Sequence, residues 1–138
     1  MSRYCLDTSA YSNFRRGHPR LVELLDRAEW VGMPTTTLGE LHTGFRLGRH
    51  RERNEAELSE FLANPAVQVV DVDAEVSRHY ADIVAELRRA GTPLPTNDIW
   101  IAATAARSGS LLLTFDRHFE QVDRVGAVIL THGGSPPD

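Results

Sequence analysis

The chain has 138 residues and a formal net charge of −4, with 41% hydrophobic and 25% charged residues, values typical of one soluble globular domain. All 15 basic residues are arginines, which excludes mechanisms that need a lysine, such as P-loop phosphate binding and Schiff-base chemistry. The negative net charge also argues against a general nucleic-acid coat protein.

The N-terminal segment does not resemble a secretion signal, because Asp7 interrupts its apolar stretch. No apolar run approaches the roughly 18 residues needed to span a bilayer. Cys5, the only cysteine, has no partner for an internal disulfide. We therefore expect a cytoplasmic protein with no membrane segment, built as one domain over residues 1–132 and a disordered tail over residues 133–138.

The first half of the chain alternates short apolar runs with segments of helical periodicity. Asp7 ends the first apolar run, and Thr8 and Ser9 are placed to cap the next turn of helix. The elements expected here are a strand over 3–6, a helix from about residue 18, a strand over 30–33 stopped by Pro34, a helix opened by Thr36 and Thr37, and a further helix after the basic stretch 46–53.

The second half continues the alternation. The expected elements are a strand over 67–72, an amphipathic helix from Val76 that stops at Gly91, a buried helix over 99–106, a strand over 111–115 and a last strand within 125–130. Strands alternating with helices predict an α/β fold with a central parallel sheet of about five strands, covered by helices on both faces.

Acidic residues fall where these elements should meet. Asp7 and Asp116 each close an apolar strand. Glu40 and Asp98 each lie near the start of a helix. Because an open parallel sheet presents ligand-binding side chains at the carboxyl ends of its strands, we expect these four carboxylates to converge.

Converging carboxylates repel one another. At ~5 Å and an effective dielectric of about 20, each ionised pair costs roughly 3 kcal/mol. A hard divalent cation removes this repulsion, and carboxylate oxygen is the ligand that Mg²⁺ and Mn²⁺ prefer. The pattern therefore predicts a metal-dependent hydrolase acting on a phosphodiester.

Taken singly, three of the acids also have structural explanations. Glu40 fits a capping box with Thr37. Asp98 could be a first-turn acid favoured by the helix dipole. Asp116 has Arg117 beside it as a neutralising partner. Only the convergence of all four residues distinguishes a functional site from these alternatives.

Other polar residues are candidates for secondary roles. His118 is expected on the surface, and the histidine spacing does not fit a zinc site. The basic stretch 46–53 is either a solvated face or a contact for RNA or a protein partner. The accessory candidates at the site are Thr8, Asn97 and Thr114, and the candidate contact arginines are Arg46, Arg49, Arg51 and Arg53.

The motifs together resemble those of the PIN-domain nucleases, most closely the VapC-type toxins of bacterial toxin–antitoxin systems. This resemblance implies that the four acids bind Mg²⁺, for which Mn²⁺ can substitute, and catalyse RNA cleavage. It also implies a homodimer and a cognate antitoxin that blocks the site. The motifs that carry it are DTS at 7–9, GEL at 39–41, TNDIWIAATA at 96–105 and LLTFDRHF at 112–119.

The residues themselves indicate direct attack by water on phosphorus, since no serine, cysteine or lysine is arranged as a nucleophile. Single-stranded or looped RNA is the expected substrate, because its backbone can bend into a cleft. A phosphoacceptor or haloacid-dehalogenase-like enzyme is disfavoured because Ser9 stands where that chemistry needs a second acid. The alternatives that stay open are a housekeeping RNA-processing PIN nuclease and a non-catalytic interaction module.

Overall fold

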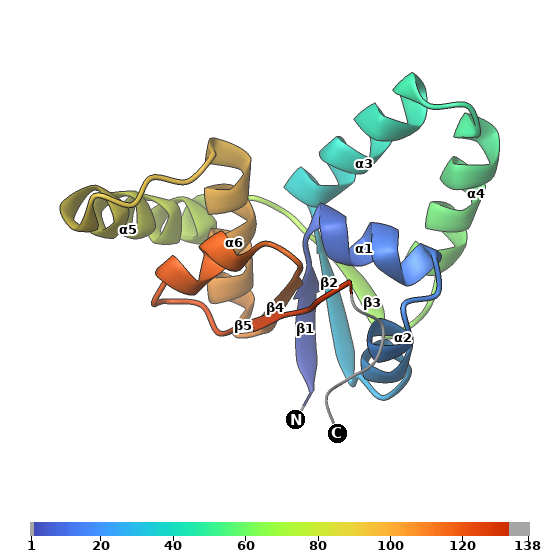
Figure 1. Ribbon diagram of the computed structural model, residues 1–138, viewed down its shortest axis with the longest axis horizontal. Coiled ribbons are helices and arrows are strands. Elements are labelled where there is room, and N and C mark those ends of the chain that lie inside the picture. The colour runs from blue at the N-terminus through green and yellow to red at the C-terminus, as the bar shows by residue number, and fades with distance from the viewer. Residues whose placement is uncertain (1, 133–138) are drawn as a thin grey trace.

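The computed structural model describes residues 2–132, so the tail expected over 133–138 lies outside the described residues. The strands form one parallel five-stranded sheet in the order β3-β2-β1-β4-β5 (Figure 1). The predicted α/β fold with a central parallel sheet is confirmed. The strands are β1 (Arg3–Leu6), β2 (Trp30–Pro34), β3 (Val67–Val70), β4 (Leu111–Thr114) and β5 (Ala127–Ile129).

Helices cover both faces of this sheet (Figure 1). On one face lie α1 (Thr8–Arg15), α2 (Pro19–Asp26), α3 (Thr35–Leu47) and α4 (Arg51–Leu62). On the other lie α5 (Ala74–Ala90), α6 (Thr96–Ser108) and the short 3₁₀ helix η1 (Arg117–Gln121). None of the helices within residues 2–132 has the length and hydrophobicity that crossing a membrane would require.

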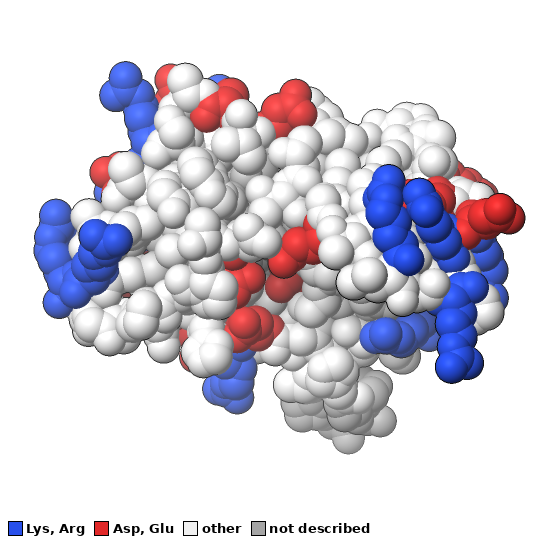
Figure 2. All heavy atoms as spheres, turned by 90° about the horizontal axis from the view of Figure 1, so that it is seen from above, with Lys and Arg blue, Asp and Glu red and all other residues white. Residues whose placement is uncertain are grey.

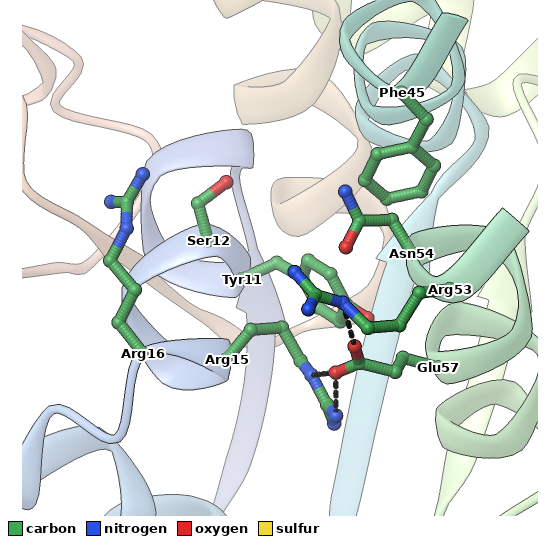
Figure 3. A pocket seen from close by; sticks show the side chains of 8 residues that line it. All are labelled: Tyr11, Ser12, Arg15, Arg16, Phe45, Arg53, Asn54 and Glu57. Carbon is green, nitrogen blue, oxygen red and sulfur yellow. Dashed lines mark hydrogen bonds and ion pairs between the residues drawn. The ribbon is translucent and has the colours of Figure 1, made fainter. Parts of the chain in front are cut away.

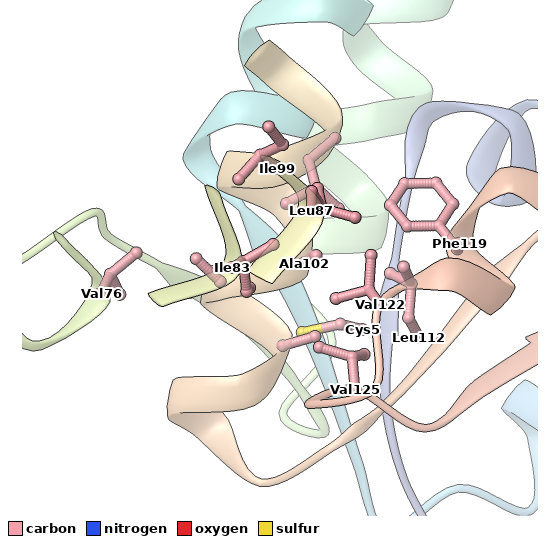
Figure 4. Close-up of a cluster of buried hydrophobic side chains, with 13 residues drawn as sticks. Cys5, Val76, Ile83, Leu87, Ile99, Ala102, Leu112, Phe119, Val122 and Val125 are labelled. Atoms are coloured by element: carbon pink, nitrogen blue, oxygen red, sulfur yellow. The ribbon is translucent and has the colours of Figure 1, made fainter. Parts of the chain in front are cut away.

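The two central strands divide their side chains between two hydrophobic cores. Cys5 and Leu112 point into the core under α5 and α6 (Figure 4). Leu6 and Leu113 point into the core under α1 to α4. Because Cys5, Leu6, Leu112 and Leu113 are buried on both faces of the sheet, these parts of β1 and β4 are continuously apolar rather than alternating.

The chain order creates a crevice at the carboxyl ends of β1 and β4. The first three strands run outward to one edge, and the chain then returns to add β4 and β5 on the other side of β1. Leu6 is aligned with Leu113, and the Asp7 amide donates to the Leu113 carbonyl oxygen at 3.3 Å. Asp7 and Thr114 therefore emerge side by side at this switch point, where open α/β sheets bind ligands.

The start of α3 excludes one structural explanation for Glu40. The helix begins at Thr35 with Pro34 as its N-cap, so Glu40 lies in the second turn. The Thr37 hydroxyl is buried and donates to the Leu6 carbonyl oxygen at 3.0 Å. The capping box predicted between Thr37 and Glu40 is wrong, because Thr37 already lies inside the helix and anchors it to β1.

Candidate functional site

The structure brings the four predicted acids to one cavity of about 330 Å³ at the carboxyl edge of the sheet. We call this cavity the acid pocket. Figure 2 looks onto that edge and shows acidic side chains gathered around a hollow, with basic side chains at both flanks. The residues that line the acid pocket are Asp7, Thr8, Ser9, Ser12, Glu40, Asp98, Ile101 and Asp116.

Asp7 is the most firmly held of the four acids. Its Oδ1 accepts hydrogen bonds from the Ala10 amide at 2.8 Å and the Ser9 hydroxyl at 2.7 Å, and its Oδ2 accepts one from the Thr114 hydroxyl. Asp7 is thus itself the N-cap of α1, whereas Thr8 and Ser9 were predicted to be. Burial raises the pKa of Asp7, the three hydrogen bonds lower it, and the charge of Asp116 raises it.

Ser9 has a positioning role that the sequence did not reveal. Its hydroxyl donates to Asp7 and accepts from the Phe115 amide at 3.1 Å. It thereby joins the first turn of α1 to the chain that follows β4. The DTS motif was a local signal for a hydroxyl beside Asp7, but the bond to Phe115 spans 106 residues and has no local signature.

Asp98 lies in the first turn of α6. Its pKa is raised to about 6, chiefly by burial and then by the negative charges of Asp116, Glu40 and Asp7, with a smaller opposite effect of His118. No hydrogen bond from residues 2–132 contributes to lowering it. Asp98 is therefore exposed to the repulsion of the three other acids, and a helix dipole alone does not account for its position.

Glu40 is oriented by two of the predicted accessory residues. Its Oε1 accepts from the Thr8 hydroxyl at 2.6 Å, and its Oε2 accepts from the Asn97 side-chain amide at 3.5 Å. Asn97 belongs to α6 and Thr8 to α1. Glu40 thus connects three helices across the acid pocket.

Asp116 is bonded to a histidine rather than to the predicted arginine. Its Oδ1 accepts from the His118 backbone amide at 2.9 Å and lies 2.9 Å from His118 Nδ1. Arg117 instead pairs with Glu120 at 3.6 Å. The pairing of Asp116 with Arg117 is therefore wrong, because the turn into η1 places residue 118, not 117, beside the carboxylate.

Thr114 links the two acids carried by the sheet. Its hydroxyl donates to Asp7 and accepts from the Asp116 backbone amide at 3.0 Å. The side chain is fully buried, so this arrangement is shielded from water. All three predicted accessory residues thus contact one of the acids.

The four arginines predicted to contact RNA or a protein partner lie on different elements of the structure. Arg46 lies on α3, Arg49 in the connecting loop, and Arg51 and Arg53 on α4. All four are exposed. Only Arg53 lines one of the larger cavities, which lies between α1 and α4.

The acid pocket offers carboxylate and hydroxyl oxygens and, among the described residues, positions no conventional nucleophile. Its donor set is entirely oxygen, which suits hard divalent ions rather than zinc. As the side chains stand within residues 2–132, no three acidic, histidine or cysteine residues are already grouped as ligands of one ion.

Residues 4–125 match the family model for the PIN domain. Ribonuclease VapC4 of Mycobacterium tuberculosis is 33% identical over 102 residues, which cover 74% of this chain and 78% of that protein. Ribonuclease VapC2 of Haemophilus influenzae is 32% identical over 127 residues, which cover 88% and 93% of the two chains.

Solved structures agree with these sequence relatives. The DNA-bound VapBC complex of Salmonella typhimurium contains a chain that superposes with a TM-score of 0.82 at 27% identity, covering 94% of this chain and 98% of that one. VapBC-5 of Mycobacterium tuberculosis, a member of a family of toxin–antitoxin systems, gives 0.75 at 26% identity, covering 94% and 100%. The sequence motifs, the sheet order and these matches show that the chain belongs to the PIN-domain family, in the group that includes the VapC proteins.

Proposed function

We propose that this protein is a Mg²⁺- or Mn²⁺-dependent endoribonuclease, the toxin of a toxin–antitoxin system. The observation that carries the proposal is the meeting of Asp7, Glu40, Asp98 and Asp116 in one pocket at the switch point of the sheet. The VapC relatives are named as ribonucleases, and one is named as a tRNA(fMet)-specific endonuclease. RNA is accordingly the proposed substrate.

The acid pocket fits a hard divalent ion. Asp7, Asp98 and Asp116 would hold it, with Glu40 completing the ligand set or orienting a water. The raised pKa of Asp98 supports this, because burial and then the negative charges of Asp116, Glu40 and Asp7 outweigh the opposite effect of His118. When bound, the ion activates water and neutralises charge at the phosphate.

The chain's own residues position the reacting groups. Thr114 and Ser9 fix the orientation of the Asp7 carboxylate, and Thr8 fixes that of Glu40. The Ser9 hydroxyl is engaged at both its donor and acceptor sides, so it is a positioning residue and not a nucleophile. Water attacks phosphorus in line and the bond to the 3′ oxygen breaks, which leaves a 5′-phosphate and a 3′-hydroxyl.

A cognate VapB-like antitoxin is the proposed partner, and the proposed assembly is a homodimer that forms an inhibited complex with it. The structural relatives are solved as VapBC complexes. An antitoxin that blocks the acid pocket would inhibit cleavage by excluding RNA.

Cleavage of a pool of cellular RNAs by the purified protein tests the function. Cutting should require Mg²⁺ or Mn²⁺, stop in EDTA, and fall by roughly 10³-fold or more in Asp98→Asn. Asp71→Asn makes the same chemical change at an exposed residue that does not line the acid pocket and should cut like the wild type. Undiminished cutting by Asp98→Asn, or cutting that persists in EDTA, would overturn the proposal.

A further inference from the structure

A second cavity, of about 340 Å³, lies between α1 and α4, with the end of α3 at its side (Figure 3). We call it the α1–α4 cavity. Ser12 lines both this cavity and the acid pocket, so the two adjoin. A polymer that crosses the acid pocket on this side therefore meets the α1–α4 cavity next.

The α1–α4 cavity carries a surplus of positive charge. Glu57 is its only acidic residue, against three arginines. Arg15 Nε lies 3.1 Å from Glu57 Oε2, and Arg53 Nε lies 3.5 Å from Glu57 Oε1 (Figure 3). The third arginine, Arg16, makes no ion pair with the residues that the structure describes. The Glu57 carboxylate thus neutralises part of the positive charge of the three arginines, and the remaining charge favours binding of an anion.

The wall of the cavity contains a buried polar group without a partner. Tyr11 is 2% exposed, and its buried hydroxyl forms no hydrogen bond with residues 2–132. Burial raises its pKa to about 12, so the hydroxyl stays protonated and can donate. A buried hydroxyl without a hydrogen bond lowers the stability of a fold. A ligand that accepts a hydrogen bond from the Tyr11 hydroxyl would offset this cost.

The remaining lining suits a nucleoside. Phe45 presents an aromatic ring and Asn54 an amide that can both donate and accept (Figure 3). Base–aromatic contact is tolerant of sequence, while an amide can read the edge of a base. A volume of about 340 Å³ is at the lower end of the range that small-ligand sites occupy.

We propose that the α1–α4 cavity is a nucleotide subsite, in which Arg15, Arg16 and Arg53 bind the phosphate adjacent to the scissile one. The incoming phosphate displaces Glu57 from the arginines, and its nucleoside meets Tyr11, Phe45 and Asn54. This inference rests on the proposed ribonuclease function and adds a site of substrate recognition outside the four acids.

Another cavity that adjoins the acid pocket lacks these features. It shares Glu40 with the acid pocket and has a volume of about 710 Å³. It contains no arginine, and its lining is of small and neutral residues besides Glu40: Thr36, Gly39, Thr43, Gly44 and Asn97. Of the two cavities that adjoin the acid pocket through a shared residue, the α1–α4 cavity is therefore the one whose lining can bind a phosphate by charge.

Binding of RNA without turnover tests the subsite. The probe is a fluorescent single-stranded RNA of about ten nucleotides, bound by protein carrying Asp98→Asn in Mg²⁺ and followed by anisotropy. In this background Arg53→Gln should weaken binding about tenfold and reduce the salt slope by about one. Arg89→Gln removes the same charge from exposed α5, on the other face of the sheet, and should change affinity less than about twofold.

Two further variants separate recognition from folding. Glu57→Gln frees the arginines and should strengthen RNA binding by about threefold or more. Tyr11→Phe removes only the unpaired hydroxyl, so it should weaken binding severalfold while the midpoint of thermal unfolding stays equal or rises. If the cavity were purely structural, Arg53→Gln and Glu57→Gln would not change RNA affinity in opposite directions.

Unchanged RNA binding by Arg53→Gln and Tyr11→Phe would overturn the subsite even if metal-dependent cleavage is observed. If these variants bind RNA normally but bind the antitoxin more weakly, the cavity belongs to the protein partner and the inference is equally overturned. Failure of the proposed function is seen separately, as a wild-type protein that does not cut RNA in either metal.

Discussion

The acid pocket is built from two kinds of carboxylate. Asp7 and Asp116 are carried by the carboxyl ends of β1 and β4, and both accept hydrogen bonds from backbone amides. Glu40 and Asp98 project from helices and accept none from the backbone within the described residues. The backbone thus holds the acids at the sheet edge in place, whereas of the acids on the helices Glu40 is held only by side chains, and Asp98 accepts no hydrogen bond from the described residues.

This difference explains how the site can be both stable and charged. Asp7 is deeply buried, but three donors surround its oxygens. Asp98 is more open, yet it experiences the repulsion of three neighbouring acids without a donor of its own. A bound cation would therefore reduce electrostatic repulsion most at Asp98. Substitutions of the acids at the sheet edge and of those on the helices should accordingly change stability by different amounts.

The largest expected effect comes from metal. Mg²⁺ at about 100 times its dissociation constant should raise the free energy of unfolding by about 2.7 kcal/mol, since it binds only the folded state. Asp98→Asn should show clearly less stabilisation at the same Mg²⁺ concentration. Urea unfolding with Mg²⁺, compared with NaCl at equal ionic strength, measures this. Equal stabilisation of both proteins would place the ion elsewhere.

Substitutions of Asp7, at the end of β1, should show how much its hydrogen bonds contribute to the stability of the fold. Asn keeps an oxygen for the Ala10 amide, whereas Ala removes the N-cap and leaves buried donors unpaired. We expect Asp7→Ala to be less stable than Asp7→Asn by about 2 kcal/mol. The same pair of variants at Asp98 should differ by less than about 0.5 kcal/mol. Urea unfolding in EDTA compares all four, and a similar gap at both positions would contradict the distinction.

Asp98 should also make stability depend on pH. Its pKa is about 6 in the folded protein against 3.8 for the free group, so between these values the folded state binds more protons than the unfolded state. Stability from this residue therefore falls as pH rises from about 4 to about 6. Because Asp98 is partly exposed, we expect Asp98→Asn to be more stable at pH 7 by only roughly 1 to 2 kcal/mol.

The difference between the two proteins should shrink toward zero as the pH is lowered to about 4, because wild-type Asp98 is then protonated in the folded state and only about half ionised in the unfolded chain. Urea unfolding in EDTA at both pH values measures it. Taking the difference between the proteins cancels the contributions of other titrating groups. A gap that stays constant over this range would mean that the Asp98 charge is not its source.

The sequence was sufficient for the parts of the site that follow from topology. A parallel sheet places the ends of its strands at one edge, so Asp7 and Asp116 could be predicted to converge from their positions alone. The helix that ends at Gly91 was equally predictable, because Gly91 adopts the left-handed conformation that terminates it.

Side-chain pairings over long separations could not be predicted. Arg15 meets Glu57 across 42 residues, and Ser9 meets Phe115 across 106. Closeness in sequence was also a poor guide to which arginines lie together. Arg53 lines a cavity with Arg15 and Arg16, at the end of α1, and not with Arg49. Such contacts depend on how helices pack over the sheet, which composition and periodicity leave undetermined.

The smallest expected effect concerns the bond that steadies a helix-borne acid. Thr8 donates to Glu40 at 2.6 Å, and Thr8→Val keeps the shape of the side chain but removes the hydroxyl. Because the bond is only partly buried, its loss should change stability by less than about 1 kcal/mol. Cleavage should fall severalfold in kcat with little change in KM, since Glu40 is steadied and RNA is not contacted.

Thr8→Ser retains the hydroxyl and should recover most of the activity, which distinguishes orientation of Glu40 from simple packing at position 8. Steady-state cleavage of one RNA substrate by the three proteins gives kcat and KM separately. If Thr8→Ser were as impaired as Thr8→Val, the methyl group rather than the hydrogen bond would be the important feature. The orientation of Glu40 would then not depend on the hydroxyl of Thr8 in α1.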